Sequence, residues 1–258
     1  MFDRNKIILN HLRAFNTENK KVVSFLNQVY SEASEKLSIK KDRKINILEL
    51  YARNFLLNYS LNKQRINYTI YKTTTIDKLK FNEENSISLK SGFSNIKEKY
   101  FDLCISLFPI VSDSDLPKVL NFVYRALSKG GKCLFIFHST DSCLKLKKIF
   151  YKYFDSKKKN SFLPCFDIMS LGNNASSVGF KNVVVDKSRY FITSKNISEV
   201  WQFIRDMGES NYTSDRNKKY IGKQSYRLMT NDLKKHLLKN NKITNEVSIN
   251  YLMGIKKN

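Results

Sequence analysis

A strand, a helix and a second strand follow one another within residues 100–137 of this chain. Phe101–Phe108 is an apolar run of the kind that forms a strand buried on both faces. Cys133–Phe137 is a second such run. This order predicts two parallel strands joined by a helical crossover. The fold class that follows is α/β, with a mostly parallel sheet.

The sequence between the two strands carries the signals of a helix. Ser114 is a candidate N-cap, and Pro117 falls in the first turn, where its missing N–H has no partner to lose. Lys129 and the pair Gly130-Gly131 are expected to end the helix. Apolar residues recur between them at helical spacing: Leu116, Val119, Leu120, Val123 and Leu127.

The rest of the chain predicts elements on either side of this unit. Two helices are expected ahead of the sheet, over residues 1–16 and 22–37. The alternation of Val247, Ile249, Tyr251 and Met253 predicts a final strand, which we expect to run antiparallel. The other expected elements are strands over 45–50, 66–71, 181–186 and 190–193, short ambiguous segments at 76–79 and 87–89, and helices over 55–61, 146–153, 167–177, 198–207 (capped by Ser198) and 231–238.

The loop after the first strand, residues 51–55, has an unusual composition. In a doubly wound sheet this loop meets a nucleotide-like ligand, and it needs glycine so that the backbone can approach. Here it reads Tyr-Ala-Arg-Asn-Phe. The second strand often ends in an acid that holds a ribose, but Lys72 and three threonines stand there instead. Asp77, or Glu83 and Glu84, are possible substitutes for that acid.

The formal net charge is +23, and it has two interpretations. One is an acidic partner, such as an acidic protein, a nucleic acid or a membrane surface. The other is mutational bias, since the chain is rich in Lys, Asn and Ile. The lysines are dispersed, with one tight run at 157–159, and no nucleic-acid motif accompanies them. The sequence therefore predicts no specific nucleic-acid partner.

Targeting signals and cysteine pairing are not evident. We expect no membrane span, because no run of 18 apolar residues occurs, and no secretory signal at the N-terminus. The four cysteines lack CxxC spacing. A reduced, cytoplasmic location is the expectation.

Three segments resemble the class I S-adenosylmethionine-dependent methyltransferases. They are the opening Phe2-Asp3-Arg4, the unit FDLCISLF…DLPKVLNFVYRALSKGGKCLFIF, and VGFKNVVVD followed by WQFIRDMGESN and SINYLMGIKK. Within this family, the chain looks like the group that contains BioC, the malonyl-acyl-carrier-protein O-methyltransferase of biotin synthesis. The same group contains the mitochondrial complex I assembly factor that hydroxylates an arginine. The MGESN segment at 207–211 is slightly closer to the assembly-factor branch.

The resemblance implies a Rossmann-like methyltransferase fold with helices on both faces of a twisted sheet. It implies one domain over 1–258, with N-terminal helices (1–40), a cofactor half (41–154) and a substrate-side half (155–258). It also implies S-adenosylmethionine as cofactor, with the family's acidic position at Glu49 and its three glycines replaced by Tyr51, Arg53 and Phe55. The cofactor-binding residues it suggests include Glu49, Leu50, Tyr51, Ala52 and Arg53.

Other candidate site residues come from their positions in the chain. Ser106 ends the strand at the edge where ligands bind, although a serine satisfied within the fold is as good an interpretation. Arg4 and Arg13 are candidates for holding a substrate anion, and the alternative is solvation. Arg205, Glu209 and Asn211 either reach over the pocket from the C-terminal half or form an ordinary helix cap and loop.

No catalytic residue is assigned from the sequence. Methylation of a carboxylate needs positioning more than acid–base chemistry, so the scattered His11, His138 and His236 do not argue for or against it. No metal-ligand spacing is present.

Three functions stay open at this point. The first is O-methylation of malonyl-acyl carrier protein, and the second is modification of a respiratory complex I subunit. The third is a methyltransferase-fold scaffold that has lost its cofactor, with Tyr51, Arg53 and Phe55 filling the site.

Overall fold

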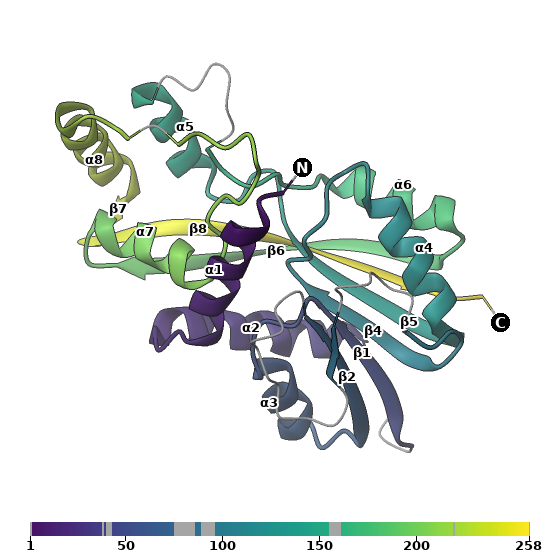
Figure 1. The fold of residues 1–258 in the computed structure, drawn as a ribbon. Coiled ribbons are helices and arrows are strands. Elements are labelled where there is room, and N and C mark those ends of the chain that lie inside the picture. The colour runs from purple at the N-terminus through teal and green to yellow at the C-terminus, as the bar shows by residue number, and fades with distance from the viewer. Residues whose placement is uncertain are drawn as a thin grey trace. The chain divides into compact units, whose positions relative to one another are not determined.

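The computed structural model describes residues 2–37, 39, 43–74, 86–88, 96–154, 161–218 and 220–257. Helices and strands alternate through most of this chain (Figure 1). The helices are α1 (Arg4–Phe15), α2 (Lys20–Leu37), α3 (Leu56–Lys63), α4 (Leu116–Ala126), α5 (Leu144–Tyr153), α6 (Ile168–Val178), α7 (Ile197–Asp206) and α8 (Lys223–Leu237). The strands are β1 (Ile45–Leu50), β2 (Tyr68–Thr74), β3 (Ser86–Ser88), β4 (Phe101–Leu107), β5 (Leu127–His138), β6 (Lys181–Ser194), β7 (Leu238–Lys239) and β8 (Lys242–Ile255).

The described strands form one sheet in the order β3-β2-β1-β4-β5-β8-β6, with β7 paired to β8. The neighbours from β3 to β5 are all parallel, and β8 runs antiparallel to β5. Cys104 of β4 lies opposite Cys133 of β5 in this register. The predicted fold class is confirmed, including the antiparallel final strand.

Two compact units can be distinguished in the chain. Unit 1 comprises residues 1–25, 140–165 and 189–248, and unit 2 comprises residues 26–139, 166–188 and 249–258. β6 and β8 contribute residues to both. These units do not follow the predicted boundaries at 40 and 154, and the prediction of a single domain over 1–258 stays a prediction.

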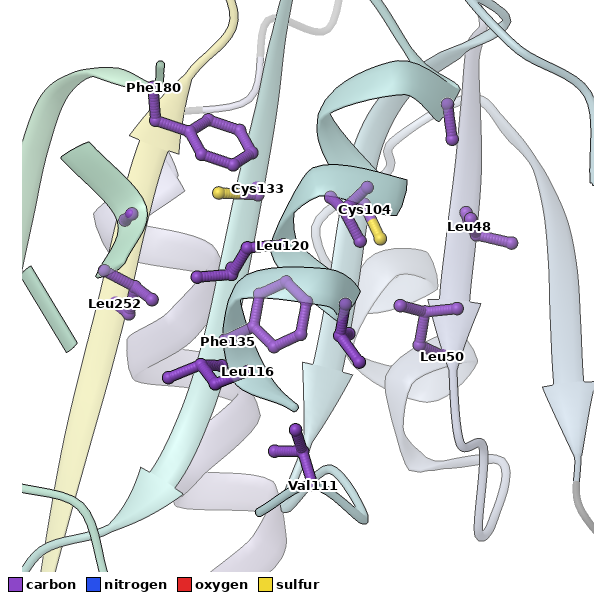
Figure 2. Packing of buried hydrophobic residues seen from close by; sticks show 14 of the residues in the cluster. Leu48, Leu50, Cys104, Val111, Leu116, Leu120, Cys133, Phe135, Phe180 and Leu252 are labelled. Carbon is purple, nitrogen blue, oxygen red and sulfur yellow. The ribbon is translucent and has the colours of Figure 1, made fainter. Parts of the chain in front are cut away.

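In unit 2, helices cover both faces of the sheet. Figure 2 shows Leu116 and Leu120 of α4 packed with Phe135 and Cys133 of β5 and with Leu252 of β8. Neighbouring residues of a strand point to opposite faces, so the residue before Leu252 faces away from α4. That residue, Tyr251, is buried, and its hydroxyl donates to the Val29 carbonyl oxygen of α2 (3.4 Å).

Unit 1 has its own hydrophobic core, built mainly from α5, α7 and α8. Its buried side chains recur at helical spacing, so each helix presents one apolar face. The members are Leu146, Ile149, Ile197, Val200, Met229, Leu233, Leu237 and Ile243.

The predicted end of the central helix is wrong. α4 ends at Ala126, and β5 already begins at Leu127, which pairs with Phe101. Gly131 packs where a Cβ atom would lie 2.9 Å from the Ser128 carbonyl oxygen, and Gly130 has φ +69°. The two glycines therefore shape the irregular start of a strand and do not cap a helix.

Two predicted N-caps are also wrong. α4 is preceded by Asp115, whose side chain makes no capping bond, and Ser114 lies one residue earlier. The N-cap of α7 is Asn196, which accepts from the Glu199 N–H (3.0 Å). Ser198 lies inside that helix, because Asn caps as well as Ser and comes first in the chain.

Other differences concern element lengths. The two strands predicted over 181–186 and 190–193 are parts of the single strand β6, and α8 begins at Lys223, eight residues before 231. The predicted segment at 76–79, the lysine run at 157–159, and Asp77, Glu83 and Glu84 all lie outside the described residues.

Candidate functional site

The sheet order places the candidate site at the carboxyl ends of β1 and β4. These two strands are neighbours, and the chain continues from β1 towards β2 on one side and from β4 towards β5 on the other. A ligand in an open α/β sheet binds at such a switch point. The loop after β1 and the residue after β4, Phe108, therefore lie where a ligand of such a sheet binds.

Tyr51 occupies the first of the three replaced glycine positions. Its φ is +56°, in the left-handed region that glycine adopts most easily, and its side chain is buried. Its N–H donates to Thr73 Oγ1 (3.0 Å), and the Ala52 N–H donates to the Thr73 carbonyl oxygen (2.9 Å). Burial, followed by the charge of Asp115, raises the pKa of Tyr51 to about 12. The loop thus keeps a glycine-like backbone while it carries a large buried ring.

Arg53 takes the second position and reaches across to β4. Its side chain is buried, with 3% of the residue exposed, and its Nη2 donates to the Phe108 carbonyl oxygen. The guanidinium carbon lies 5.9 Å from the centroid of the Phe108 ring. This contact joins the loop after β1 to the residue that follows β4.

Phe108 is held in turn by the end of β5. Its N–H donates to the Ile136 carbonyl oxygen (2.8 Å), and its ring stacks on His138 with centroids 4.1 Å apart. The interplanar angle is 14°. The residues that end β1, β4 and β5 therefore form one packed cluster.

Glu49, the family's acidic position, is also engaged within the fold. Only 2% of the residue is exposed, and it forms a side-chain hydrogen bond with Tyr30 of α2. Burial, the charge of Glu49 and this hydrogen bond raise the pKa of Tyr30 well above its usual value, although Arg53 acts in the opposite direction. The Tyr30 hydroxyl consequently stays protonated and is a donor for the carboxylate.

Lys72 stands where a ribose-binding acid is common. It is the register partner of Glu49 on β2, and the residue is 1% exposed. Its ammonium lies 4.4 Å from the ring centroid of Phe55, the third glycine replacement. A cation over an aromatic face is a favourable packing arrangement. A lysine ammonium has no acceptor atom, so it cannot accept hydrogen bonds from ribose hydroxyl groups as a carboxylate does.

Ser106 links two strands of the sheet. Its Oγ donates to the Leu50 carbonyl oxygen (3.0 Å) on the neighbouring strand, and both residues are fully buried. This geometry favours the interpretation of a serine satisfied within the fold. The six predicted cofactor-binding residues, Glu49, Leu50, Tyr51, Ala52, Arg53 and Ser106, do lie together in unit 2.

These residues do not fit S-adenosylmethionine. The cofactor's amino-acid and ribose parts need space beside the backbone after β1, together with an acceptor at the end of β2. Tyr51 and Arg53 fill the first region with buried side chains, and Lys72 offers a cation in the second. In this structure, the buried side chains at the site pack against other residues of the protein, as Arg53 does against Phe108.

The predicted substrate-binding residues, Arg4, Arg205, Glu209 and Asn211, all belong to unit 1. Arg4 is exposed, as is Arg13, and Arg205 is exposed and donates to Gln202 Oε1 (2.8 Å). Asn211 accepts from both the N–H and the hydroxyl of Thr213 at 2.9 Å. The Glu209 N–H donates to the Ile204 carbonyl oxygen (3.1 Å), as expected after a helix end.

The opening Phe-Asp-Arg segment has a structural role in unit 1. Asp3 caps α1 by accepting from the Lys6 N–H (3.1 Å), and its other oxygen accepts from Arg216 (2.7 Å). These two donors lower the pKa of Asp3. Phe2 meets Tyr212 edge to face at 5.3 Å. The segment therefore ties α1 to the loop at 212–216.

The MGESN segment packs against the same helix. Gly208 has φ +78°, and a Cβ atom there would lie 2.8 Å from the Asn10 carbonyl oxygen of α1. Asn10 is fully buried and donates to the Ser210 carbonyl oxygen. Glycine is required here by this close approach, whatever ligand the protein binds.

Sequence reasoning missed Tyr30, Phe108 and His138 as members of the site. Phe108 follows β4 and His138 ends β5, so both stand at the sheet edge where ligands bind. That rule was a signal for these two residues. No signal in the sequence pointed to Tyr30, because it lies on α2, which precedes the first strand of the sheet.

The part of the chain that the structure describes lacks two other features. No group of three or more His, Cys, Asp or Glu side chains there is arranged to hold a metal ion. None of the helices that the structure describes is long and apolar enough to cross a membrane.

Comparison with known proteins points to a methyltransferase fold. The chain is similar to a putative methyltransferase of Bacillus halodurans, with a TM-score of 0.55 at 8% identity over 90% of this chain and 100% of that one. It is also similar to the YcgJ protein of Bacillus subtilis, with a TM-score of 0.53 at 10% identity over 90% and 99%. At such identities the likeness establishes the fold, which is the class I methyltransferase fold.

Among curated proteins, the chain resembles malonyl-[acyl-carrier protein] O-methyltransferase 1 of Coxiella burnetii. The identity is 25% over 132 residues, which is 51% of this chain and 45% of that protein. The chain thus matches less than half of the length of this relative. No protein-family model matches the chain.

Proposed function

We propose that this protein binds an acidic protein partner through a methyltransferase fold and does not use S-adenosylmethionine. The observation that carries the proposal is the hydrogen bond from Arg53 to the Phe108 carbonyl oxygen, which connects the loop after β1 to the residue that follows β4. A methyltransferase binds its cofactor at this edge of the sheet.

The energetic consequence of this contact for cofactor binding is large. Displacing a buried, hydrogen-bonded arginine costs about 3 kcal/mol. That cost weakens an affinity by about two orders of magnitude, so a micromolar ligand becomes roughly a 0.1 mM one. Removal of Tyr51 from its buried site adds to this penalty.

The partner is inferred from charge and from the curated relative. A net charge of +23 attracts acidic proteins over long distances. The Coxiella relative is a malonyl-[acyl-carrier protein] O-methyltransferase, so acyl carrier protein is the first acidic partner to test. A respiratory complex I subunit is the alternative partner, suggested by the resemblance of residues 207–211 to the assembly-factor group.

A second candidate function is O-methylation of malonyl-acyl carrier protein in biotin precursor synthesis. The likeness to the Coxiella enzyme favours it. On this alternative, S-adenosylmethionine supplies the methyl group, and the altered loop must rearrange to admit it. The two candidates differ in whether the isolated protein binds the cofactor.

The deciding experiment is isothermal titration of the purified protein with S-adenosylmethionine and S-adenosylhomocysteine. We expect binding no tighter than about 0.1 mM for either ligand, so that about 1 mM ligand stabilises the protein against thermal unfolding by at most about 1.4 kcal/mol. A cofactor-dependent methyltransferase measured in parallel is the positive control. Binding at about 1 μM, equivalent to about −8 kcal/mol, together with methyl transfer to malonyl-acyl carrier protein, would replace the first candidate with the second.

A further inference from the structure

The α5 and α8 helices of unit 1 pack together through their apolar faces. Leu146 and Ile149 of α5 share a core with Met229, Leu233 and Leu237 of α8. The spacing of these residues leaves the opposite side of each helix outside the core. We call the exposed sides of these two helices the α5–α8 face.

The α5–α8 face is strongly basic. It carries seven cationic side chains, and six of them are lysines. No acidic residue occurs in α5, and Asp232 is the one carboxylate in α8. The seven are Lys145, Lys148, Lys152, Lys223, Arg227, Lys234 and Lys235, all of them exposed.

Asp232 offsets one of the seven cations, Lys152, and leaves the charge of the other six in place. Its Oδ2 accepts from Lys152 (2.8 Å) and from the Tyr153 hydroxyl (3.0 Å), and its Oδ1 lies 3.2 Å from His236 Nδ1. The hydrogen bonds from Lys152 and Tyr153 lower the pKa of the carboxyl group. The other six cations of the face have no carboxylate of α5 or α8 to pair with.

Apolar side chains lie among the cations. Leu144 and Tyr151 are each 42% exposed on α5, and Leu228 is 50% exposed on α8. Mixed apolar and charged surface of this kind is typical of a protein–protein interface, where apolar contacts at the centre are surrounded by a polar rim.

We infer that the α5–α8 face docks an acidic protein surface that presents carboxylates around an apolar patch. The inference rests on the proposed function, since it locates the partner that the function requires. It adds the site of contact with the partner, which is specified neither by the buried residues at the carboxyl ends of β1 and β4 nor by the net charge.

Two other polyanions suit the face less well. A membrane surface favours helices that insert their apolar faces, and the apolar faces of α5 and α8 are buried in the core of unit 1. Lysine and arginine both pair with nucleic-acid phosphates, but the bidentate contacts that read bases are made best by arginine, and Arg227 is the one arginine among the seven cations.

The test uses the full chain and apo-acyl carrier protein as the acidic probe. The variant Lys145→Glu/Lys148→Glu/Lys235→Glu reverses three charges on the face. The control Lys20→Glu/Lys129→Glu/Lys181→Glu changes the net charge by the same amount at exposed positions elsewhere. Binding is measured by isothermal titration at fixed salt, and circular dichroism verifies that both variants fold.

We expect wild type and control to bind acyl carrier protein within about threefold of each other, and the face variant to lose at least tenfold. Equal losses in both variants would mean that net charge alone attracts the probe, and would overturn the inference. It would also be overturned if wild type failed to bind the probe, or if wild type bound vesicles of anionic phospholipid or single-stranded RNA more tightly than the probe.

The cofactor titration separates this inference from the proposed function. If S-adenosylmethionine binds and the face variant still has a lower affinity for acyl carrier protein than the control, the docking face is supported and the cofactor-free function is wrong. If neither variant changes probe binding and the cofactor does not bind, the docking face falls and the cofactor-free function stands.

Discussion

The Arg53 guanidinium donates a hydrogen bond to the main-chain carbonyl oxygen of Phe108. A side chain from the loop after β1 thereby contacts the residue that follows β4, across the switch point of the sheet. Both residues are almost completely buried. The strength of this connection, and what it blocks, can be measured directly.

Replacing Arg53 with alanine should destabilise the protein by about 2–4 kcal/mol. The loss follows because a buried charged group, its hydrogen bond to Phe108 and the volume of its side chain are removed together. Urea denaturation followed by circular dichroism measures the change. Arg205→Ala is the control, because Arg205 is exposed, and its effect should stay within about 0.5 kcal/mol. A loss of under about 1 kcal/mol for Arg53→Ala would show that the contact contributes little.

Restoring glycine at the three loop positions should create affinity for S-adenosylmethionine. In the variant Tyr51→Gly/Arg53→Gly/Phe55→Gly, the buried side chains of Tyr51 and Arg53 and the exposed ring of Phe55 are gone, and glycine suits the φ of +56° at position 51. Isothermal titration should show binding at least tenfold tighter than in wild type. The alanine triple variant is the matched control and should gain less. Equal, weak binding in all three proteins would place the obstacle elsewhere, for example at Lys72.

Asp3 should make stability depend on pH in the acidic range. Its folded pKa lies below the usual value of 3.8, because the Lys6 N–H and Arg216 favour the carboxylate. A group with a depressed pKa contributes stability that is fully present above the unfolded pKa, and the contribution disappears as pH falls through the folded pKa. The stability difference between wild type and Asp3→Asn should therefore narrow from pH 5 to pH 2 in urea denaturation. A constant difference would mean that Asp3 does not titrate abnormally.

Gly208→Ala should destabilise unit 1 by about 1–3 kcal/mol or more. The added Cβ meets the Asn10 carbonyl oxygen at 2.8 Å, and the φ of +78° disfavours any side chain. Gly222→Ala is the control, because nothing lies within 4 Å of its Cβ position, and it should stay within about 0.5 kcal/mol. Thermal unfolding of the two variants makes the comparison, and equal melting temperatures would contradict the expected clash.

Local signals were sufficient to predict the fold. The apolar runs that became β1, β4 and β5 are buried on both faces, and such strands are hard to mistake for anything else. Boundaries failed where long-range pairing overrode local preference. Gly130-Gly131 is a typical helix end, yet the pairing of Leu127 with Phe101 draws the same residues into a strand.

The candidate site was predicted in part. The anomalous loop at 51–55 was visible in the sequence, because a glycine position is defined by its place after a strand. The residues that contact the side chains of this loop could not be predicted from the sequence. Tyr30 and Phe108 meet Glu49 and Arg53 through the tertiary fold, and no spacing along the chain encodes those contacts.

Cys104 and Cys133 are register partners on the neighbouring strands β4 and β5 (Figure 2), and neither has exposed surface. Burial raises the pKa of both thiols, that of Cys133 to about 12. A thiol-modifying reagent can therefore reach either sulfur atom only when the two strands separate. The rate at which such a reagent labels them in the native protein reports how often the centre of the sheet opens. The two cysteines are therefore built-in probes of unfolding at this part of the sheet.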